Sequence, residues 1–154
     1  SDLFNSGMRP AVNVGLSVSR VGGAAQTKAM KKAAGTIRID LAQYREMEVF
    51  TQFSSDLDDT TKEQLQYGKG LMELLKQPLC HPMSLADQVI TLVTANNRLL
   101  LDVETKQTKD FQLRLLDFFH AEHKDIVDEL NNNKVLNKEL TEKIVAAVKE
   151  FKSR

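Results

Sequence analysis

The sequence predicts an all-helical fold, a bundle of about five helices that follows a short segment of different character. From Ala24 onward, apolar residues recur every three or four positions, which is the period of a helix face. Capping residues and prolines divide this part into segments of ordinary helix length. Residues 1–23 lack that period and are rich in Gly, Ser and Val. We therefore expect two units, a strand or loop segment over 1–23 and a helical bundle domain over 24–154.

Residues 1–23, called the leader below, are expected to contain no long helix. Asn, Ser and Gly within 5–9 indicate a turn, and Pro10 would end any helix before it. Residues 11–18 alternate loosely between valines and small residues, which favours a short strand or an extended loop. Because a lone strand has no pairing partner here, we interpret the leader as the edge of a sheet that lies upstream of Ser1.

The first helix is expected to run from Ala24 through Phe50. Gly35 interrupts its apolar face and is expected to kink it, at a cost of about 1 kcal/mol relative to Ala. The expected inward face consists of Ala25, Ala29, Ala33, Ile37, Leu41, Tyr44, Met47 and Phe50.

The second helix is expected over 59–77, with Asp58 as its N-cap and with Pro78 and Pro82 ending it. A third begins after Ser84, where Ser84-Leu85-Ala86-Asp87 resembles a capping box, and reaches Asn97. A fourth follows Thr108 and ends at the asparagines 131–133, and Asn137 caps the last. The expected inward residues are Leu65, Met72 and Leu75 in the second helix, Phe111, Leu115, Phe118, Ile126 and Leu130 in the fourth, and Leu140, Ile144, Val148 and Phe151 in the last.

Composition excludes several classes of protein. The chain has 154 residues, of which 42% are hydrophobic and 27% charged, so it is an ordinary globular sequence and not a disordered one. No window approaches the roughly 18 apolar residues of a membrane span, so we expect no direct membrane insertion. The single Cys80 cannot form an internal disulfide.

The zero net charge conceals an asymmetry between the two ends of the chain. Residues 1–45 carry seven cations and two anions, a net charge of +5, and the remainder carries −5. A basic segment of this kind suits a phosphate-bearing ligand or an acidic partner, although two solvated faces can also differ in this way. No nucleic-acid-binding module accompanies the lysines at 28, 31 and 32, so nucleic acid is not expected as a partner.

The segment from Arg9 to Thr27 carries the most specific pattern. Pro10, Ala11, Val12, Asn13, Ser17 and Ser19 fill every defined place of Pro-small-aliphatic-Asn/Asp-three residues-Ser-any-Ser. This pattern resembles the signature of the alpha and beta subunits of rotary ATP synthases. The continuation Ser-Arg-Val-Gly-Gly-Ala-Ala-Gln is similar to the alpha chains. Further similar segments are Leu41-Ala42-Gln43-Tyr44-Arg45-Glu46, Gln52-Phe53, Ser55-Asp56-Leu57-Asp58, Glu73-Leu74-Leu75-Lys76-Gln77 and Pro82-Met83.

The resemblance implies a fragment of an F-type alpha subunit: the end of an α/β nucleotide-binding domain, followed by the C-terminal helical domain. In this family, three alpha and three beta subunits alternate in a ring around a gamma shaft, with a peripheral stalk. The complex makes ATP from ADP and phosphate using a proton gradient. It is peripheral on the cytoplasmic face of the bacterial plasma membrane, or on the equivalent organelle inner membrane.

Arg20 is the candidate catalytic residue. The resemblance makes it the arginine finger that alpha offers to the neighbouring beta catalytic site, with Ser17 shaping the finger loop and Ser19 beside it. A planar guanidinium with several donors suits the charge that develops on a transferring phosphoryl group. Spacing alone favours an ordinary surface arginine beside a turn, and only the surrounding signature reverses that interpretation. No His or acid is placed near Ser17 or Ser19 to activate a nucleophile.

By the same resemblance, Phe4, Arg9, Pro10 and Gln77 surround the adenine and ribose of a noncatalytic nucleotide, ATP or ADP with Mg²⁺. The chain departs from the family pattern at Leu79, where a second Gln is usual, and Leu79 cannot hydrogen-bond a base. The sequence has no Gly-x-x-x-x-Gly-Lys-Ser/Thr loop, and Gly68-Lys69-Gly70 is only an echo of one. We therefore expect no tightly bound nucleotide and no enzyme activity in this chain alone.

Two other interpretations are weaker. His120 and His123 are spaced to share a helix face, but zinc takes three or four ligands, so no metal site is expected. The alternative to the alpha-subunit interpretation is an independent helical interaction module without a nucleotide role.

Overall fold

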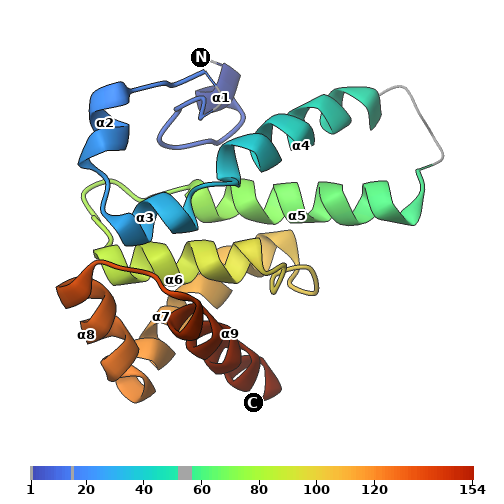
Figure 1. The fold of residues 1–154 in the computed structure, drawn as a ribbon. Coiled ribbons are helices and arrows are strands. Elements are labelled where there is room, and N and C mark those ends of the chain that lie inside the picture. Colours follow the sequence, from blue (N-terminus) through green and yellow to red (C-terminus); the bar gives the residue numbers. More distant parts are fainter. Residues whose placement is uncertain (1, 15, 52–56) are drawn as a thin grey trace.

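The computed structural model describes residues 2–14, 16–51 and 57–154, and over these residues every regular element is a helix (Figure 1). The predicted all-helical class is confirmed. The elements are α1 (Asp2–Asn5), α2 (Arg20–Ala25), α3 (Lys28–Ala33), α4 (Ile37–Thr51), α5 (Asp59–Leu75), α6 (Leu85–Asn96), the 3₁₀ turn η1 (Thr105–Gln107), α7 (Thr108–Glu122), α8 (Lys124–Asn133) and α9 (Lys138–Ser153). No helix among the described residues is long and apolar enough to cross a membrane.

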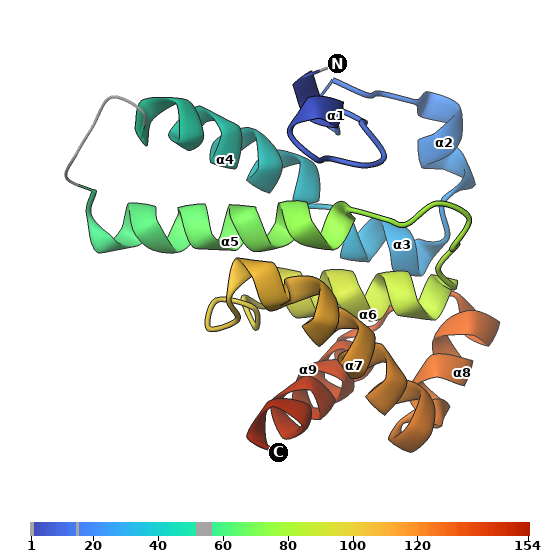
Figure 2. The same ribbon diagram turned by 180° about the vertical axis from the view of Figure 1, so that it is seen from behind.

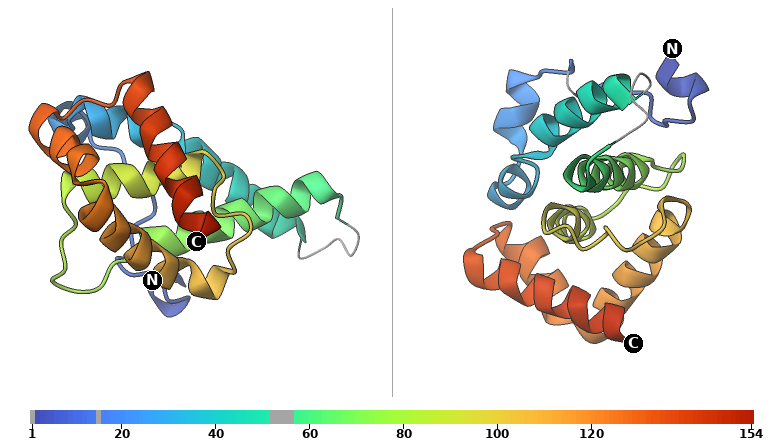
Figure 3. Two further views of the ribbon diagram at one scale, coloured as in Figure 1. Left: turned by 90° about the horizontal axis from the view of Figure 1, so that it is seen from below. Right: turned by 90° about the vertical axis from the view of Figure 1, so that its right-hand side faces the viewer.

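The helices form layers around α6. α4 and α5 lie antiparallel as a hairpin, and α6 lies on the side of α5 that faces away from α4 (Figures 1 and 2). α7, α8 and α9 cover the other side of α6, and the leader lies on the α4 side of the bundle (Figure 3). α6 is therefore enclosed by other helices.

The interior of the bundle is centred on α6. This helix buries residues on several faces, and α3, α5, α7, α8 and α9 all contact it. Its buried residues are Ala86, Val89, Ile90, Thr91, Val93, Thr94 and Ala95. Small and β-branched side chains let neighbouring helices approach closely, and burial of apolar area of this kind is the main favourable term in folding.

The first expected helix is three helices in the structure. The predicted face is confirmed at Ala29, Ala33, Ile37, Leu41 and Tyr44, all of which are buried. The prediction of Ala25 on that face is wrong, because α2 ends there and Thr27 caps a new helix by accepting from the Met30 N–H at 3.2 Å. A second break falls at Gly35, between α3 and α4, as its position in the pattern predicted. The side chain of Phe50 lies outside the described residues, as do Gln52, Phe53, Ser55 and Asp56.

The fourth expected helix is also divided. α7 ends at Glu122, and His123 leaves helical geometry with φ −124° and ψ 42° before α8 begins. The His123 ring packs 5.0 Å from the Phe118 ring and 5.6 Å from the Phe119 ring, centroid to centroid. This change of direction lets Ile126 and Leu130 join the core, so the inward residues are as predicted although the single helix is not.

Caps were predicted correctly at two of three sites. Ser84 Oγ accepts from the Asp87 N–H at 3.1 Å, and Asn137 Oδ1 accepts from the Leu140 N–H at 2.7 Å. Asp58 precedes α5, but its carboxylate accepts from the Thr61 hydroxyl and caps no backbone N–H. In α5 itself Leu65 is buried as expected. Leu71 and Leu74 are also buried, whereas Met72 and Leu75 are only half-buried.

The leader contains no strand among its described residues, so of the two alternatives the structure has the extended loop. Its backbone is hydrogen-bonded into local turns, with the Val12 N–H donating to the Pro10 carbonyl at 2.9 Å. Met8 is buried and Val14 packs against the core. Without a neighbouring strand, the leader satisfies its polar groups by local turns and by a bond from the Gln77 N–H to the Arg9 carbonyl at 2.8 Å.

Gly68, part of the apparent phosphate-loop echo, has a packing role. It lies in the middle of α5, and a Cβ built there would be 2.2 Å from Tyr44 Cδ2. The buried Tyr44 ring therefore rests directly on the α5 backbone, which only a glycine permits.

We predict that Gly68→Ala destabilises the chain by about 1–3 kcal/mol, because the added methyl must displace the Tyr44 ring. Gly70→Ala is the matched control: it lies in the same helix, and its Cβ would meet nothing within 4 Å. Removing a helical glycine should stabilise there by about 0.5–1 kcal/mol. Urea unfolding of the two variants measures the difference. Equal midpoints would contradict the proposed contact.

We also predict that residues 24–154 fold without the leader, since the buried faces of α3 to α9 close on one another. A chain beginning at Ala24 should keep a cooperative thermal transition by circular dichroism. The midpoint should be lower than that of the full chain, because the contacts of Met8 and Val14 are lost. A broad, non-cooperative transition would show that the leader is part of the folding unit.

Candidate functional site

The candidate finger residue stands on the arginine loop, defined here as residues 13–25. Two turns build its first half: the Ser17 N–H donates to the Asn13 carbonyl at 2.8 Å, and the Leu16 N–H donates to Asn13 Oδ1 at 3.2 Å. Asn is suited to this role because its side chain can bond the backbone a few residues on. Asn13 thus determines where Ser17 lies.

The second half of the loop is the short helix α2. Ser19 is its N-cap, and Ser19 Oγ accepts from the Gly22 N–H at 2.9 Å. Arg20 is the first residue of α2 and is exposed, as is Ser17. Ser17 and Ser19 line a pocket of about 610 Å³ that Lys31 and Arg38 also line.

Large apolar side chains flank Arg20. Leu16 is 82% exposed, Val18 71% and Val21 82%. Three large apolar side chains this exposed within six residues of sequence favour a segment that another protein covers. The arginine loop therefore offers a permanently charged guanidinium within an apolar rim.

The second predicted cluster is brought together by the fold. The Arg9 guanidinium carbon lies 4.5 Å from the centre of the Phe4 ring, a cation–π contact. The Gln77 N–H, just beyond α5, donates to the Arg9 carbonyl at 2.8 Å. Pro10 follows directly. Arg9 thus contacts both Phe4 and Gln77, although the whole α4–α5 hairpin lies between Arg9 and Gln77 in the sequence.

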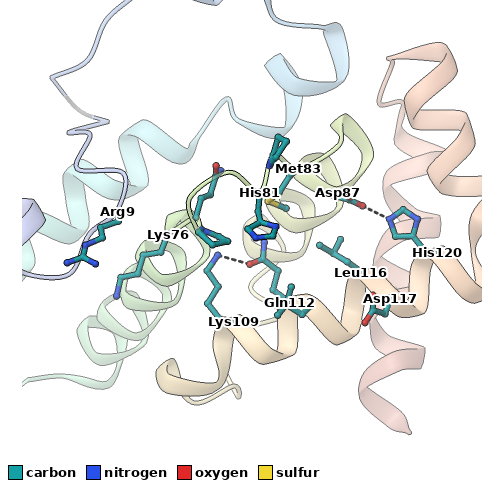
Figure 4. A pocket seen from close by; sticks show the side chains of 14 residues that line it. Arg9, Lys76, His81, Met83, Asp87, Lys109, Gln112, Leu116, Asp117 and His120 are labelled. Carbon is teal, nitrogen blue, oxygen red and sulfur yellow. Dashed lines mark hydrogen bonds and ion pairs between the residues drawn. The ribbon is translucent and has the colours of Figure 1, made fainter.

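A pocket of about 620 Å³ opens beside Arg9 and Gln77, between the connector 76–83 and α7 (Figure 4). Its lining combines cations, the carboxylates of Asp87 and Asp117, and apolar side chains such as Met83 and Leu116. Lys109 Nζ donates to the Leu74 carbonyl at 3.0 Å and to Gln112 Oε1 at 2.9 Å, and burial lowers the pKa of Lys109. Such a lining suits a ligand that has an apolar or aromatic part together with polar groups.

The sequence did not predict the side of this pocket that α6 and α7 form. His120 Nε2 lies 2.7 Å from Asp87 Oδ1 across the pocket wall. Asp87 and His120 lie 33 residues apart on α6 and α7, so no local sequence pattern marks the pair. His120 and His123 have different neighbours, and among the described residues no group of three or more metal-binding side chains gathers.

Comparison with known proteins identifies the family of the chain. The family model described as "ATP synthase alpha/beta chain, C terminal domain" matches residues 26–151. The chain belongs to this ATP synthase family. It is also 49% identical, over all 154 of its residues, to ATP synthase subunit alpha of Caldanaerobacter subterraneus subsp. tengcongensis. It covers 30% of that relative's length.

The two comparisons cover different parts of the site. The ATP synthase family model begins at Gln26, so the matched domain is the helical bundle and the arginine loop precedes it. The similarity to the alpha subunit spans the whole chain and therefore includes the leader. Gln77 lies within the family domain, whereas Phe4, Arg9 and Arg20 lie within the segment shared with the alpha subunit.

Proposed function

We propose that this chain is part of the alpha subunit of a proton-translocating ATP synthase and that Arg20 is its arginine finger. The carrying observation is an exposed guanidinium on a capped loop with an apolar rim, in a segment shared with an alpha subunit. The rim docks on a neighbouring beta subunit, and docking presents Arg20 to the catalytic nucleotide there. Ser17 shapes the loop and contributes to activity.

The chemistry of phosphoryl transfer explains why an arginine is used. Negative charge spreads over the oxygens of the transferring phosphoryl group in the transition state. The planar guanidinium donates to more than one of these oxygens, and it keeps its charge at all physiological pH values. Binding that strengthens only in the transition state raises turnover and leaves substrate affinity largely unchanged.

In this proposal the alpha subunit alternates with beta in a ring around a gamma shaft, held by a peripheral stalk. The complex is peripheral on the cytoplasmic face of the bacterial plasma membrane, or on the equivalent organelle membrane, and makes ATP from ADP and phosphate using the proton gradient. The exposed cations of the leader and of α3 suit acidic surfaces of neighbouring subunits.

Phe4, Arg9, Pro10 and Gln77 contact the adenine and ribose of a noncatalytic nucleotide in the whole subunit. Their arrangement in the fold supports this role: the Arg9 guanidinium lies over the Phe4 ring, and the Gln77 backbone N–H donates to the Arg9 carbonyl. Mg²⁺ bound with the nucleotide would neutralise phosphate charge. Leu79 is 89% exposed and apolar, so base recognition depends on Gln77 and on backbone groups. The alternative of an independent interaction module leaves the likeness of the leader to an alpha subunit unexplained.

We predict that the isolated chain does not bind ATP–Mg²⁺ measurably and has no ATPase activity. The sequence lacks the glycine-rich loop whose amides and lysine cradle the phosphates, so only the base contacts remain. Isothermal titration calorimetry tests this, with an intact alpha subunit as the positive control. A saturable site of micromolar affinity in the isolated chain would be the contrary result.

For the assembled complex, we predict that Arg20→Lys lowers the kcat of ATP hydrolysis by about 10³–10⁵ while assembly stays intact. Lysine keeps the charge but loses the planar fork of donors. Steady-state hydrolysis at saturating ATP is the measurement, with assembly checked by gel filtration.

Arg114→Lys is the matched control, because Arg114 is an exposed arginine of α7 paired with Asp110 at 3.1 Å. A surface arginine of this kind costs no more than about 0.5 kcal/mol of stability when replaced. If Arg20→Lys resembles Arg114→Lys in turnover, Arg20 is not a finger in this protein.

A further inference from the structure

We propose that Ser19 is a positioning residue for Arg20: its hydroxyl caps α2 at the Gly22 amide and thereby sets the direction in which the Arg20 side chain leaves the backbone. This inference rests on the proposed finger role of Arg20. It goes beyond that role in saying that the backbone carrying Arg20 is already ordered before a partner or a nucleotide binds.

The helix that carries Arg20 has little else to stabilise it. α2 is six residues long, and none of them is buried. Isolated helices of this length are unstable in water, because the free-energy cost of nucleation exceeds the gain from the hydrogen bonds of a single turn. α2 therefore depends on local hydrogen bonds, chiefly Ser19 Oγ with the Gly22 N–H at 2.9 Å and the Ser19 carbonyl with the Gly23 N–H at 3.0 Å.

The Arg20 side chain has no restraint of its own. Within the described part of the chain it makes no hydrogen bond or ion pair. The backbone at the first turn of α2 therefore sets the position and direction of the Arg20 Cα–Cβ bond, and Ser19 defines that turn. A frayed first turn disperses the guanidinium over many positions. Few of these positions allow hydrogen bonds to the phosphoryl oxygens, because a catalytic group must be held in a narrow geometry.

Gly22 is matched to this cap. A Cβ built on Gly22 would lie 3.1 Å from Ser19 Oγ and 3.3 Å from Ser19 Cβ, closer than ordinary contact. A Cβ on the adjacent Gly23 would meet nothing within 4 Å. The two glycines are therefore not equivalent: Gly22 leaves room for the capping hydroxyl, and Gly23 has no such contact.

The test uses the complete complex with substitutions in its alpha subunit. Ser19→Ala should lower the kcat of ATP hydrolysis by about two- to thirtyfold, which is the population change expected from the loss of one N-cap, with KM for ATP unchanged. Ser19→Thr keeps a capping oxygen and should restore kcat to within about twofold of the parent. Ser19→Ala with normal kcat, or Ser19→Thr as slow as Ser19→Ala, would overturn the proposal.

A double-mutant cycle separates positioning from a general structural effect. In the Arg20→Lys background, Ser19→Ala should have no further effect on kcat, because the guanidinium that Ser19 positions is no longer present. An equal effect in both backgrounds would show that Ser19 acts independently of Arg20. Should Arg20→Lys itself leave kcat unchanged, the finger role fails, and that outcome is distinct from a failure of Ser19 alone.

Two matched controls come from the same region. Thr27→Ala removes the corresponding cap from α3, where Thr27 Oγ1 accepts from the Met30 N–H at 3.2 Å, and it should leave kcat unchanged. Gly22→Ala should reduce kcat more than Gly23→Ala, although both substitutions favour helix formation. Equal kcat values for the two alanine variants, or a Thr27→Ala loss as large as that of Ser19→Ala, would contradict the proposed role of the cap.

Discussion

The enclosure of α6 is the constraint on which the rest of the structure depends. This helix buries seven of its residues and contacts helices on several sides, so each neighbour must present an apolar face to it. The hydroxyls of its two buried threonines are both hydrogen-bonded. Thr94 Oγ1 donates to the Ile90 carbonyl at 2.8 Å, and Thr91 Oγ1 accepts from Gln112 Nε2 at 3.1 Å. Most buried polar groups in folded proteins are paired in this way.

Hydrogen bonds from side-chain amides and the backbone tie α3 and the connecting loops to the core around α6. Asn96 Nδ2 donates to the Ala33 carbonyl at 2.7 Å, and Asn131 Oδ1 accepts from the Ala86 N–H at 3.1 Å. The Ala29 N–H donates to the Lys134 carbonyl at 3.0 Å. α3 is thus held at both ends by the core. The arginine loop precedes α3 directly, so one end of the loop is anchored while α2 remains free of burial.

Local features of the fold were predictable because they depend on near neighbours in sequence. The caps at Ser84 and Asn137 and the inward residues of α7, α8 and α9 follow from side-chain type and a period of 3.6 residues. The break at His123 was not predictable, because it depends on packing against Phe118 and Phe119. Asp58 stands at the N-cap position of α5 as predicted, but its carboxylate accepts from the Thr61 hydroxyl and makes no capping bond to the backbone.

By itself, the sequence determined the helical class, the positions of most apolar faces and the motif that contains Ser17, Ser19 and Arg20. It also determined family membership, since that depends on residue order alone. Only the tertiary structure decided that Arg9 and Gln77 are neighbours, that Gly68 lies under Tyr44 and that Asp87 meets His120. The physical reason is the sequence separation over which each interaction acts. Periodicity and capping act over a few residues, whereas these contacts join segments that become adjacent only when the helices pack around α6.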